Sequence, residues 1–348
     1  MIHIFYPKEL FDPNRRGQLF PLLKPFLKDT GFTDEKRKAM YHISDREFQI
    51  VEDITQADKI ILPMSWNYYV ENKLVQKAID FIEKSKQQNK KVYSFTNGDF
   101  GVKIPRINNC IILRQSGEKS KLSSNHLGIP SFIEDPLWKH YQNKNIFIND
   151  YQSKPIIGFC GQTNDSVYNS LKEISRTFFR NLKFNIGVAK ELPQKIQSTS
   201  KLRAKILSEI KNSSKLTANF IERKKYRAGV TTKEDRLKTT QEFYDNIRDS
   251  DYVLAVRGAG NFSVRFYEAL AMGRVPVFIN TDCLLPLENK IDWKKHVVWV
   301  EENEINQIEE KITDFHNKLN PESFIRLQES NRKLWEEKLT LGGFFKHF

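Results

Sequence analysis

The chain has 348 residues, of which 39% are hydrophobic and 28% are charged, and its formal net charge is +13. A single hydrophobic core rarely grows to this length, so we expect two domains. The three cysteines are far apart, which argues against a disulfide framework or a cysteine metal site and favours a reducing compartment. The positive charge is compatible with nucleic acid, an anionic membrane surface or anionic substrates as partners, and equally with a lysine-rich solvated surface.

The first residues, MIHIFYPKELFDP, begin directly as a strand and lack the apolar core of a signal peptide. Nowhere does an apolar run approach the roughly 20 residues that a membrane helix needs. We therefore expect a cytoplasmic protein. Any contact with a membrane would be peripheral, at its inner face.

The first part of the chain alternates apolar strands with an amphipathic helix. The strands are expected at residues 2–6, 58–63, 91–96 and 109–114, and the helix at residues 71–88. Such alternation is typical of a Rossmann-like unit with a mainly parallel sheet. Residues 138–153 are polar and aromatic without clean periodicity, and we interpret them as a linker.

A second set of elements follows this linker. Strands are expected at 154–161, 216–221, 251–256, 275–279 and 296–300, and helices at 166–182, 204–214 (exposed), 234–248, 305–319 and 322–339. We expect a first domain over residues 1–150 and a second domain over residues 151–325. The last helix, about 325–348 with the tail GGFFKHF, is expected to cross back onto the first domain, with a frayed terminus as the alternative.

The predicted fold class is therefore α/β, with two Rossmann-like domains facing a cleft. Ligands of such sheets bind beyond the carboxyl ends of the strands.

Residues 251–282, DYVLAVRGAGNFSVRFYEALAMGRVPVFINTD, predict a strand, a tight loop, a helix and a second buried strand. A loop of this kind at a helix N-terminus gathers free backbone N–H groups and suits a phosphate. The candidate phosphate-binding residues in it are Arg257, Gly258, Gly260, Asn261 and Ser263. Alternatively the glycines only turn the chain, Arg257 pairs with a neighbouring carboxylate, and the two polar residues cap the helix.

Arg265 and Glu268 are three residues apart and share one face of the expected helix. At the cleft, the arginine would meet phosphate and the carboxylate would accept two vicinal hydroxyls, as a ribose offers. The alternative is an exposed ion pair, which contributes less than about 1 kcal/mol.

This stretch resembles the exostosin family of glycosyltransferases. The family shows a small-residue loop, Ser-x-Arg-x-x-Glu-Ala, a glycine, an Ile/Val-Pro-Val strand and an aspartate, then Leu-Pro-Phe and Asp-Trp. The matching residues here are Ser263 to Ala269, Gly273, Val275 to Val277, Asp282, Leu285 to Leu287 and Ile291 to Trp293. The likeness covers about 60 residues, and weaker matches lie at residues 57–63 and 128–130.

The resemblance implies the two-domain GT-B architecture, with residues 1–150 as the acceptor-side domain and residues 151–325 as the nucleotide-sugar-binding domain. It also implies an inverting transfer from a nucleotide sugar. Because the nucleotide sugar is a substrate, no cofactor is expected. It implies that Arg265 faces the donor diphosphate and Glu268 the nucleotide ribose. The family is best known from membrane-anchored Golgi enzymes, whereas this chain is expected to be a soluble relative, so the acceptor is not implied.

An inverting transfer needs a base that takes the acceptor hydroxyl proton, and in GT-B proteins it normally comes from the first domain. Asp99, after the strand KVYSFT, is the candidate, with an ordinary turn aspartate as the alternative. Asp12 is the second candidate. His3 lies too early in its strand to be favoured.

The charge of the leaving group is expected to be stabilised by Arg265, Arg257 and the helix N-terminus. Arg223, Lys224 and Arg227 are further candidates, unless they form a solvated basic loop. Residues 249–251 spell Asp-Ser-Asp, a metal-binding signature elsewhere, but they precede a strand and so lie at the wrong end for the site. We therefore expect no metal.

The sequence thus predicts a metal-independent, inverting glycosyltransferase in surface polysaccharide synthesis, with a glycan or lipid-linked acceptor. From the net charge alone we expect peripheral contact with an anionic membrane. An alternative is a fucosyltransferase-like enzyme using GDP-fucose. A basic nucleic-acid-binding protein is the alternative from another class, but no stripe of basic and stacking residues supports it.

Overall fold

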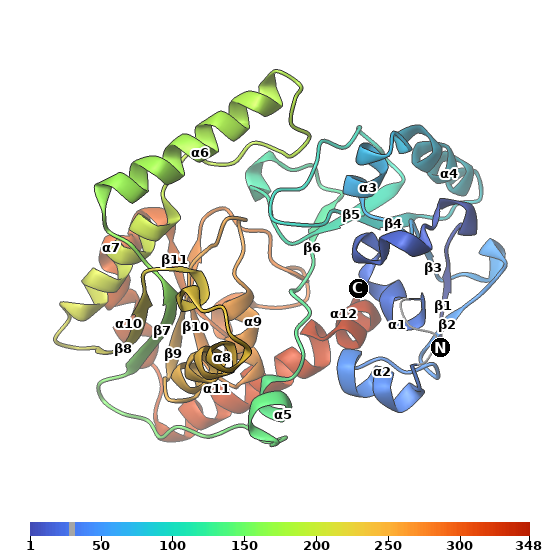
Figure 1. The fold of residues 1–348 in the computed structure, drawn as a ribbon. Helices are drawn as coiled ribbons and strands as arrows, with labels where there is room; N and C mark the ends of the chain where they lie inside the picture. Colours follow the sequence, from blue (N-terminus) through green and yellow to red (C-terminus); the bar gives the residue numbers. More distant parts are fainter. Residues whose placement is uncertain (28–31) are drawn as a thin grey trace.

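The computed structural model describes residues 1–27 and 32–348, apart from the side chains of Tyr226 and Arg227. Two parallel β-sheets organise the molecule, one in each half of the chain (Figure 1). Helices cover both sheets. The predicted α/β class with two Rossmann-like units is confirmed.

The N-terminal sheet has six strands in the order β2-β1-β3-β4-β5-β6, paired in parallel. Its strands are β1 (Ile2–Phe5), β2 (Phe48–Ile50), β3 (Lys59–Ile61), β4 (Val92–Phe95), β5 (Cys110–Arg114) and β6 (His126–Gly128). The two edge strands were not predicted, because neither belongs to an apolar run: β2 reads Phe-Gln-Ile and β6 reads His-Leu-Gly.

The helices of the N-terminal half are short except for one. They are α1 (Lys24–Leu27), α2 (Asp34–Tyr41), α3 (Trp66–Glu71) and α4 (Val75–Gln87). The helix expected at 71–88 begins only at Val75, because Lys73 has a left-handed backbone (φ 58°) that separates α3 from α4.

The C-terminal sheet has five strands in the order β11-β10-β9-β7-β8, again paired in parallel. Its strands are β7 (Ile156–Gln162), β8 (Thr217–Arg223), β9 (Tyr252–Ala255), β10 (Val275–Asn280) and β11 (Val298–Glu301). Its helices are α5 (Pro136–Tyr141), α6 (Val167–Asn185), α7 (Thr199–Lys211), α8 (Lys233–Arg248), α9 (Val264–Ala271), α10 (Ile308–His316), α11 (Pro321–Leu334) and α12 (Leu341–His347).

The stretch between the two sheets is partly helical rather than a simple linker. α5 begins there because Asp135 caps the amide of Leu137 and Pro136 occupies the first helical position. The expected domain division at residue 150 falls between β6 and β7.

The helix expected to be exposed at 204–214 is a packed helix instead. α7 starts earlier, at Thr199, where the side chain of Ser198 accepts from the amide of Lys201. Ile206, Leu207 and Ile210 are buried in the core of the C-terminal half. The expectation of exposure was wrong because three apolar positions among many charged ones suffice to bury one side of a helix.

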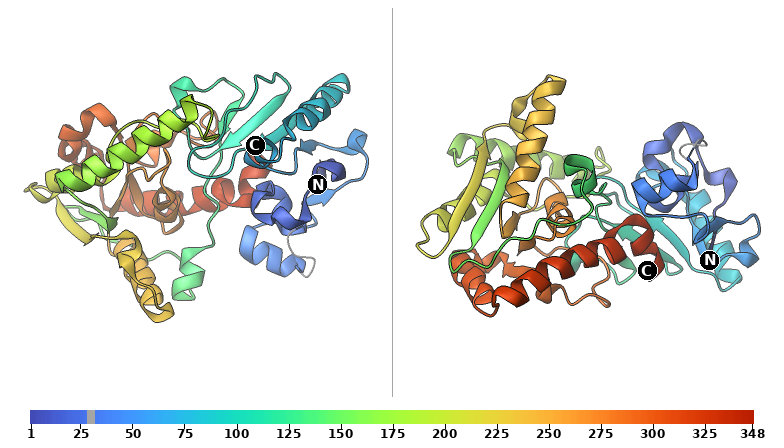
Figure 2. Two further views of the ribbon diagram at one scale, coloured as in Figure 1. Left: turned by 45° about the horizontal axis from the view of Figure 1, so that its top comes forward. Right: turned by 90° about the horizontal axis from the view of Figure 1, so that it is seen from below.

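The last helices run from beneath the C-terminal sheet to the N-terminal half, as the right-hand view of Figure 2 shows. There Phe345 packs on Phe20, with ring centroids 5.7 Å apart, and Phe348 packs on Tyr93 at 5.4 Å. The Nζ atom of Lys59 donates to the carbonyl oxygen of Phe348 over 2.9 Å. The aromatic tail is therefore part of the core.

One of the hydrophobic cores extends across both halves. It joins residues beneath the N-terminal sheet to side chains of α9 and α12, among them Phe266, Leu270 and Phe344. A backbone bridge also joins Gly128 to Pro286, and a Cβ at Gly128 would lie 2.4 Å from the carbonyl oxygen of Leu285. This close packing fixes the loops of one half against those of the other.

Candidate active site

A cavity of about 910 Å³ lies where the loops after the C-terminal strands face the N-terminal half. Ten charged side chains line it, seven cationic and three acidic, an excess of four positive charges. They are Arg176, Arg180, Lys195, Arg203, Arg223, Arg257 and Arg265, with Asp99, Glu173 and Glu268. The size and charge of this cavity suit a polyanionic ligand.

Arg265 projects from the first turn of α9 into the cavity. Its guanidinium donates to the carbonyl oxygens of Cys160 (2.6 Å) and Leu254 (3.3 Å), at the ends of β7 and β9. It also lies over the ring of Phe159, 4.6 Å from the centroid. Burial lowers its pKa to about 10, a value at which the group remains charged at neutral pH. Among the described residues, the Nε atom of Arg265 has no hydrogen-bond partner.

Glu268 lies one turn further along α9 and lines the same cavity. Its carboxylate accepts a hydrogen bond from the hydroxyl of Tyr244 on α8 over 3.1 Å. Burial raises the pKa of Glu268, while Arg265 and the Tyr244 hydrogen bond act in the opposite direction.

Arg257 and Arg203 line the cavity near the start of the loop before α9. Arg203 donates to the carbonyl oxygens of Gln162 (3.1 Å) and Arg257 (2.8 Å). Arg257 is almost fully buried, and the hydrogen bond that its guanidinium donates to the carbonyl oxygen of Ala259 is long at 3.4 Å. The Nε atoms of both arginines are buried without partners. A buried Nε–H group without a partner is costly unless a ligand satisfies it.

The glycines expected in this loop also line the cavity. A Cβ at Gly260 would lie 2.8 Å from the carbonyl oxygen of Asp99, so this position brings the loop against the N-terminal half. Gly258 has open space around it, with only a guanidinium nitrogen of Arg203 at 4.0 Å. Its backbone N–H donates to the carbonyl oxygen of Phe262 over 3.1 Å.

Ser263 and Asn261 have different surroundings. Ser263 occupies the N-cap position of α9, yet its side chain makes no capping hydrogen bond and lines the cavity. Asn261 is not brought to the cavity. Its amide donates to carbonyl oxygens of Gly117, Thr281 and Asp282, and its backbone N–H donates to Ser116. Asn261 therefore ties the loop to the N-terminal half.

Asp99 reaches the cavity from the loop after β4, so the structure brings it to the same space as Arg265 and Glu268. Burial raises the pKa of Asp99, and the nearby Arg180 partly offsets this. Asp12 is not among the lining residues; its carboxylate accepts from the amide of Asn14 and the hydroxyl of Tyr68. His3 pairs with Asp58 at the start of the N-terminal sheet.

Comparison with known proteins is informative for this part of the chain. Residues 161–314 match the Exostosin GT47 domain. These residues are similar to a glycosyltransferase domain and are called the exostosin-like domain below. Of the ten charged side chains that line the cavity, nine lie within residues 161–314, and Asp99 lies outside them.

Two relatives match parts of the chain. Exostosin-1 of Drosophila melanogaster is 32% identical over 104 residues, which are 30% of this chain and 13% of that protein. A probable glucuronosyltransferase, GUT1, of Oryza sativa subsp. japonica is 30% identical over 73 residues, 21% of this chain and 18% of that protein. The chain thus matches less than a fifth of each relative's length.

Similar solved structures include TarM, with a TM-score of 0.35 and 12% identity over 74% of this chain and 49% of that chain. The spinosyn rhamnosyltransferase SpnG, complexed with thymidine diphosphate, has a TM-score of 0.31 and 9% identity over 96% of this chain and 95% of that chain. Within the chain itself, two Rossmann-like halves around one cavity form an arrangement of the GT-B type.

Several cationic residues of the exostosin-like domain were not predicted. Arg203 comes from α7, and Arg176 and Arg180 come from α6. The segment after α6 crosses to the N-terminal half, where Val102 and Glu191 form a backbone bridge. A run of basic residues on a helix gives no sign in the sequence of which ones face inward.

The three further basic candidates, Arg223, Lys224 and Arg227, have different positions. Arg223 lines the cavity but is held by the carbonyl oxygen of Thr239 (2.8 Å) and the carboxylate of Glu242 (3.1 Å). Lys224 is exposed and is not among the lining residues. The side chain of Arg227 lies outside the described residues.

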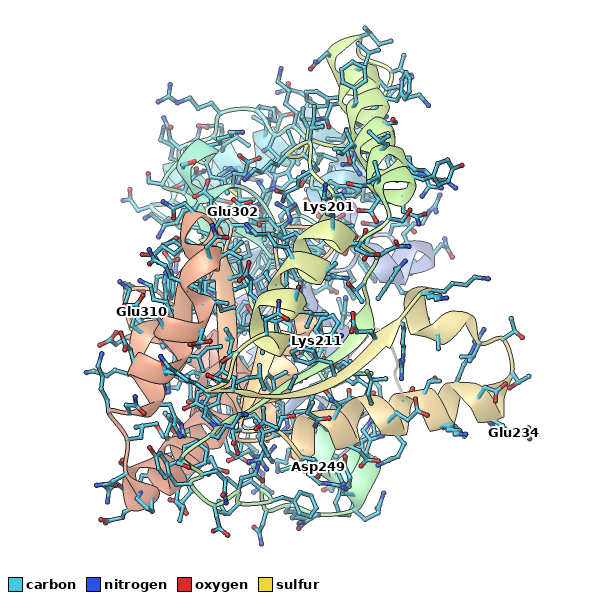
Figure 3. All side chains as sticks on the ribbon, turned by 90° about the vertical axis from the view of Figure 1, so that its left-hand side faces the viewer. Lys201, Lys211, Glu234, Asp249, Glu302 and Glu310 are labelled. Carbon is cyan, nitrogen blue, oxygen red and sulfur yellow. The ribbon has the colours of Figure 1, made fainter. Side chains whose placement is uncertain are left out.

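The Asp-Ser-Asp sequence has structural partners. Asp251 accepts from the backbone N–H of Ile156 (2.8 Å), and Asp249 pairs with Arg248. Both lie before β9, at its amino end, as Figure 3 indicates for the labelled Asp249 at the end of α8. In the described part of the chain, no three His, Cys, Asp or Glu side chains are grouped as metal ligands.

No helix in residues 1–27 and 32–348 is both long and apolar enough to cross a bilayer.

Proposed function

We propose that this protein is an inverting, metal-independent glycosyltransferase that moves a sugar from a nucleotide-diphosphate donor to a glycan or lipid-linked acceptor. The observation that carries the proposal is the pair of Arg265 and Glu268, one turn apart on α9 and facing one cation-rich cavity. The match of residues 161–314 to a glycosyltransferase domain supports the same reading.

The donor would bind at the carboxyl ends of β7 and β9. Arg265, Arg257 and the N-terminus of α9 would face its diphosphate, where charge-assisted hydrogen bonds are strong. Ser263, whose side chain makes no capping bond, would add a hydroxyl. Glu268 would accept hydrogen bonds from the two ribose hydroxyls, because its carboxylate is already oriented by the hydrogen bond from Tyr244.

Transfer would occur between the two halves. The acceptor hydroxyl oxygen attacks the anomeric carbon while the bond from that carbon to the diphosphate oxygen breaks. Asp99 takes the hydroxyl proton, and attack opposite the leaving group inverts the anomeric centre. The nucleoside diphosphate leaves with the extra negative charge, which the cavity cations stabilise.

The excess of four positive charges in the cavity supports transfer without a metal ion. Protein cations in a site partly removed from water can stabilise a leaving diphosphate without a divalent ion. We therefore expect transfer to continue after treatment with a chelator.

The proposal is tested by calorimetric titration of the purified protein with UDP, GDP and TDP, followed by donor hydrolysis and transfer assays with the sugar of the preferred base. One of the three nucleotides should bind clearly more tightly than the others, and Arg265→Lys should weaken that binding. Preference for GDP, with turnover of GDP-fucose, would favour the fucosyltransferase-like alternative. Absence of binding by all three would refute a nucleotide-sugar donor.

A further inference from the structure

Helix α6 carries an apolar face that the rest of the protein leaves uncovered. Six of its apolar side chains each expose between 44% and 73% of their surface. They are Val167, Tyr168, Leu171, Phe178, Phe179 and Leu182. The exposed apolar surface continues past the helix through Ile186 and Val188. Isolated exposed apolar residues are normal, but a continuous group of this kind marks a contact surface.

The helix lies along the outside of the molecule at the boundary between its two halves (Figures 1 and 2). Only Ser170 among its residues is fully buried. At 100° per residue, the apolar side chains share one side of α6, and the next row along the helix is basic. The exposed members of that row are Lys172, Arg176 and Lys183. Arg180 instead faces the N-terminal half, where its guanidinium lies 3.8 Å from the ring centroid of Phe100.

The single acid of α6 does not belong to this exposed surface. Glu173 faces the body of the protein, where its carboxylate accepts from the hydroxyl of Ser198 (2.8 Å) and the backbone N–H of Ser200 (3.3 Å). The exposed side of α6 is thus apolar with a cationic border and no carboxylate.

We propose that α6 docks on the surface of an anionic phospholipid bilayer, with its apolar face among the upper acyl chains and its basic row among the headgroups. An apolar helical face beside lysine and arginine fits such a surface, because the long basic side chains can reach the headgroups. A second copy of the chain fits less well, since two cationic helices would repel each other.

If the protein is the glycosyltransferase proposed above, the position of α6 also indicates the class of its acceptor. Glu173, Arg176 and Arg180 of the same helix line the cavity. A docked α6 would hold the mouth of the cavity at headgroup depth, where the sugar or phosphate of a lipid-linked acceptor lies. The acceptor class indicated is therefore lipid-linked.

Co-sedimentation of the full chain with phospholipid vesicles tests the proposal. The protein should bind vesicles that contain phosphatidylglycerol better than vesicles of phosphatidylcholine alone, and added salt should weaken this binding. Leu171→Gln with Phe178→Gln should reduce partitioning by about tenfold or more, since two apolar side chains are lost from the interface. Glutamine is a good helix former, so α6 is retained.

Lys172→Gln with Lys183→Gln should remove the preference for anionic vesicles. Leu237→Gln on α8 is the matched control, because Leu237 is also well exposed but lies on another helix, and it should bind like the wild type. Equal binding by wild type and the Leu171/Phe178 variant, or no vesicle binding at all, would overturn the proposal. So would light scattering that shows a dimer which only the α6 variant dissociates.

Nucleotide titration without vesicles separates this proposal from the proposed function. The α6 variants should keep the nucleotide affinity of the wild type, because none of the substituted residues lines the cavity. If the protein bound vesicles but no nucleotide, the proposed membrane contact of α6 would be supported and the proposed donor site would be refuted.

Discussion

Gly161 leaves the space that the guanidinium of Arg265 occupies: a Cβ at Gly161 would lie 2.8 Å from Nη2 of Arg265. The two residues are far apart in the chain, at the end of β7 and the start of α9. The absence of a side chain at Gly161 therefore helps to place the arginine proposed to face the donor diphosphate.

Gly161→Ala should displace Arg265 and weaken nucleoside diphosphate binding by roughly fivefold to twentyfold, the loss of about one charge-assisted hydrogen bond. Stability should change by less than about 1 kcal/mol, because the end of a flexible side chain can move aside. Gly17→Ala is the control, since nothing lies within 4 Å of a Cβ there. Calorimetric titration and chemical unfolding measure the two effects. Unchanged nucleotide affinity in Gly161→Ala would argue against the role of Arg265.

Glu268→Gln should bind the nucleotide at least about tenfold more weakly, because a neutral amide accepts less strongly from ribose hydroxyls. The variant should nevertheless be as stable as the wild type, or more stable, at pH 7. Burial raises the pKa of Glu268 in the folded protein, so ionisation costs stability above the ordinary pKa of 4.5.

This stability difference should shrink as the pH falls below the raised pKa, where Glu268 is protonated in the folded protein. Thermal unfolding at several pH values, with the exposed Glu234→Gln as the control, measures it. A Glu268→Gln variant that loses stability equally at all pH values would show that the carboxylate has a structural role.

Transfer activity should disappear in Asp99→Asn and fall as the pH drops through the raised pKa of Asp99, above its ordinary value of 3.8. Arg180→Gln should move this acid limb to higher pH, since the Arg180 charge lowers the pKa of Asp99. Arg176→Gln removes another cavity cation and should leave the limb in place. The pH profiles of kcat/KM test this, and an acid limb that is unaffected by Arg180→Gln would exclude Asp99 as the titrating base.

Gly342→Ala should destabilise the protein by about 2–4 kcal/mol, because a Cβ there would lie 1.8 Å from the carbonyl oxygen of His42. The backbone of α12 would have to move away from the N-terminal half, together with Phe344 and Phe345. Chemical unfolding of the variant beside Gly17→Ala measures the loss. Unchanged stability would mean that α12 contributes little to joining the halves.

The sequence was sufficient to predict the local parts of the fold and site. The strands β7, β9, β10 and β11 are buried apolar runs with clear ends, and α9 follows its loop at helical spacing. Arg265 and Glu268 share a face because they are three residues apart on one helix, which is a local property.

The sequence could not predict what depends on distant packing. Asn261 resembles a helix cap, yet its partners are in the N-terminal half and after β10. Arg203 reaches the cavity because one side of α7 is buried. The apolar residues of α7 are too few to distinguish this helix from an exposed one in the sequence. The bridge between Val102 and Glu191 joins segments with no common pattern.

The most direct test of the donor site is a crystal structure of the protein with its preferred nucleoside diphosphate. The proposal predicts phosphate oxygens within hydrogen-bond distance of Arg265 and the N-terminus of α9, and ribose hydroxyls on the carboxylate of Glu268. A nucleotide bound outside the cavity, or a ribose that does not contact Glu268, would contradict it.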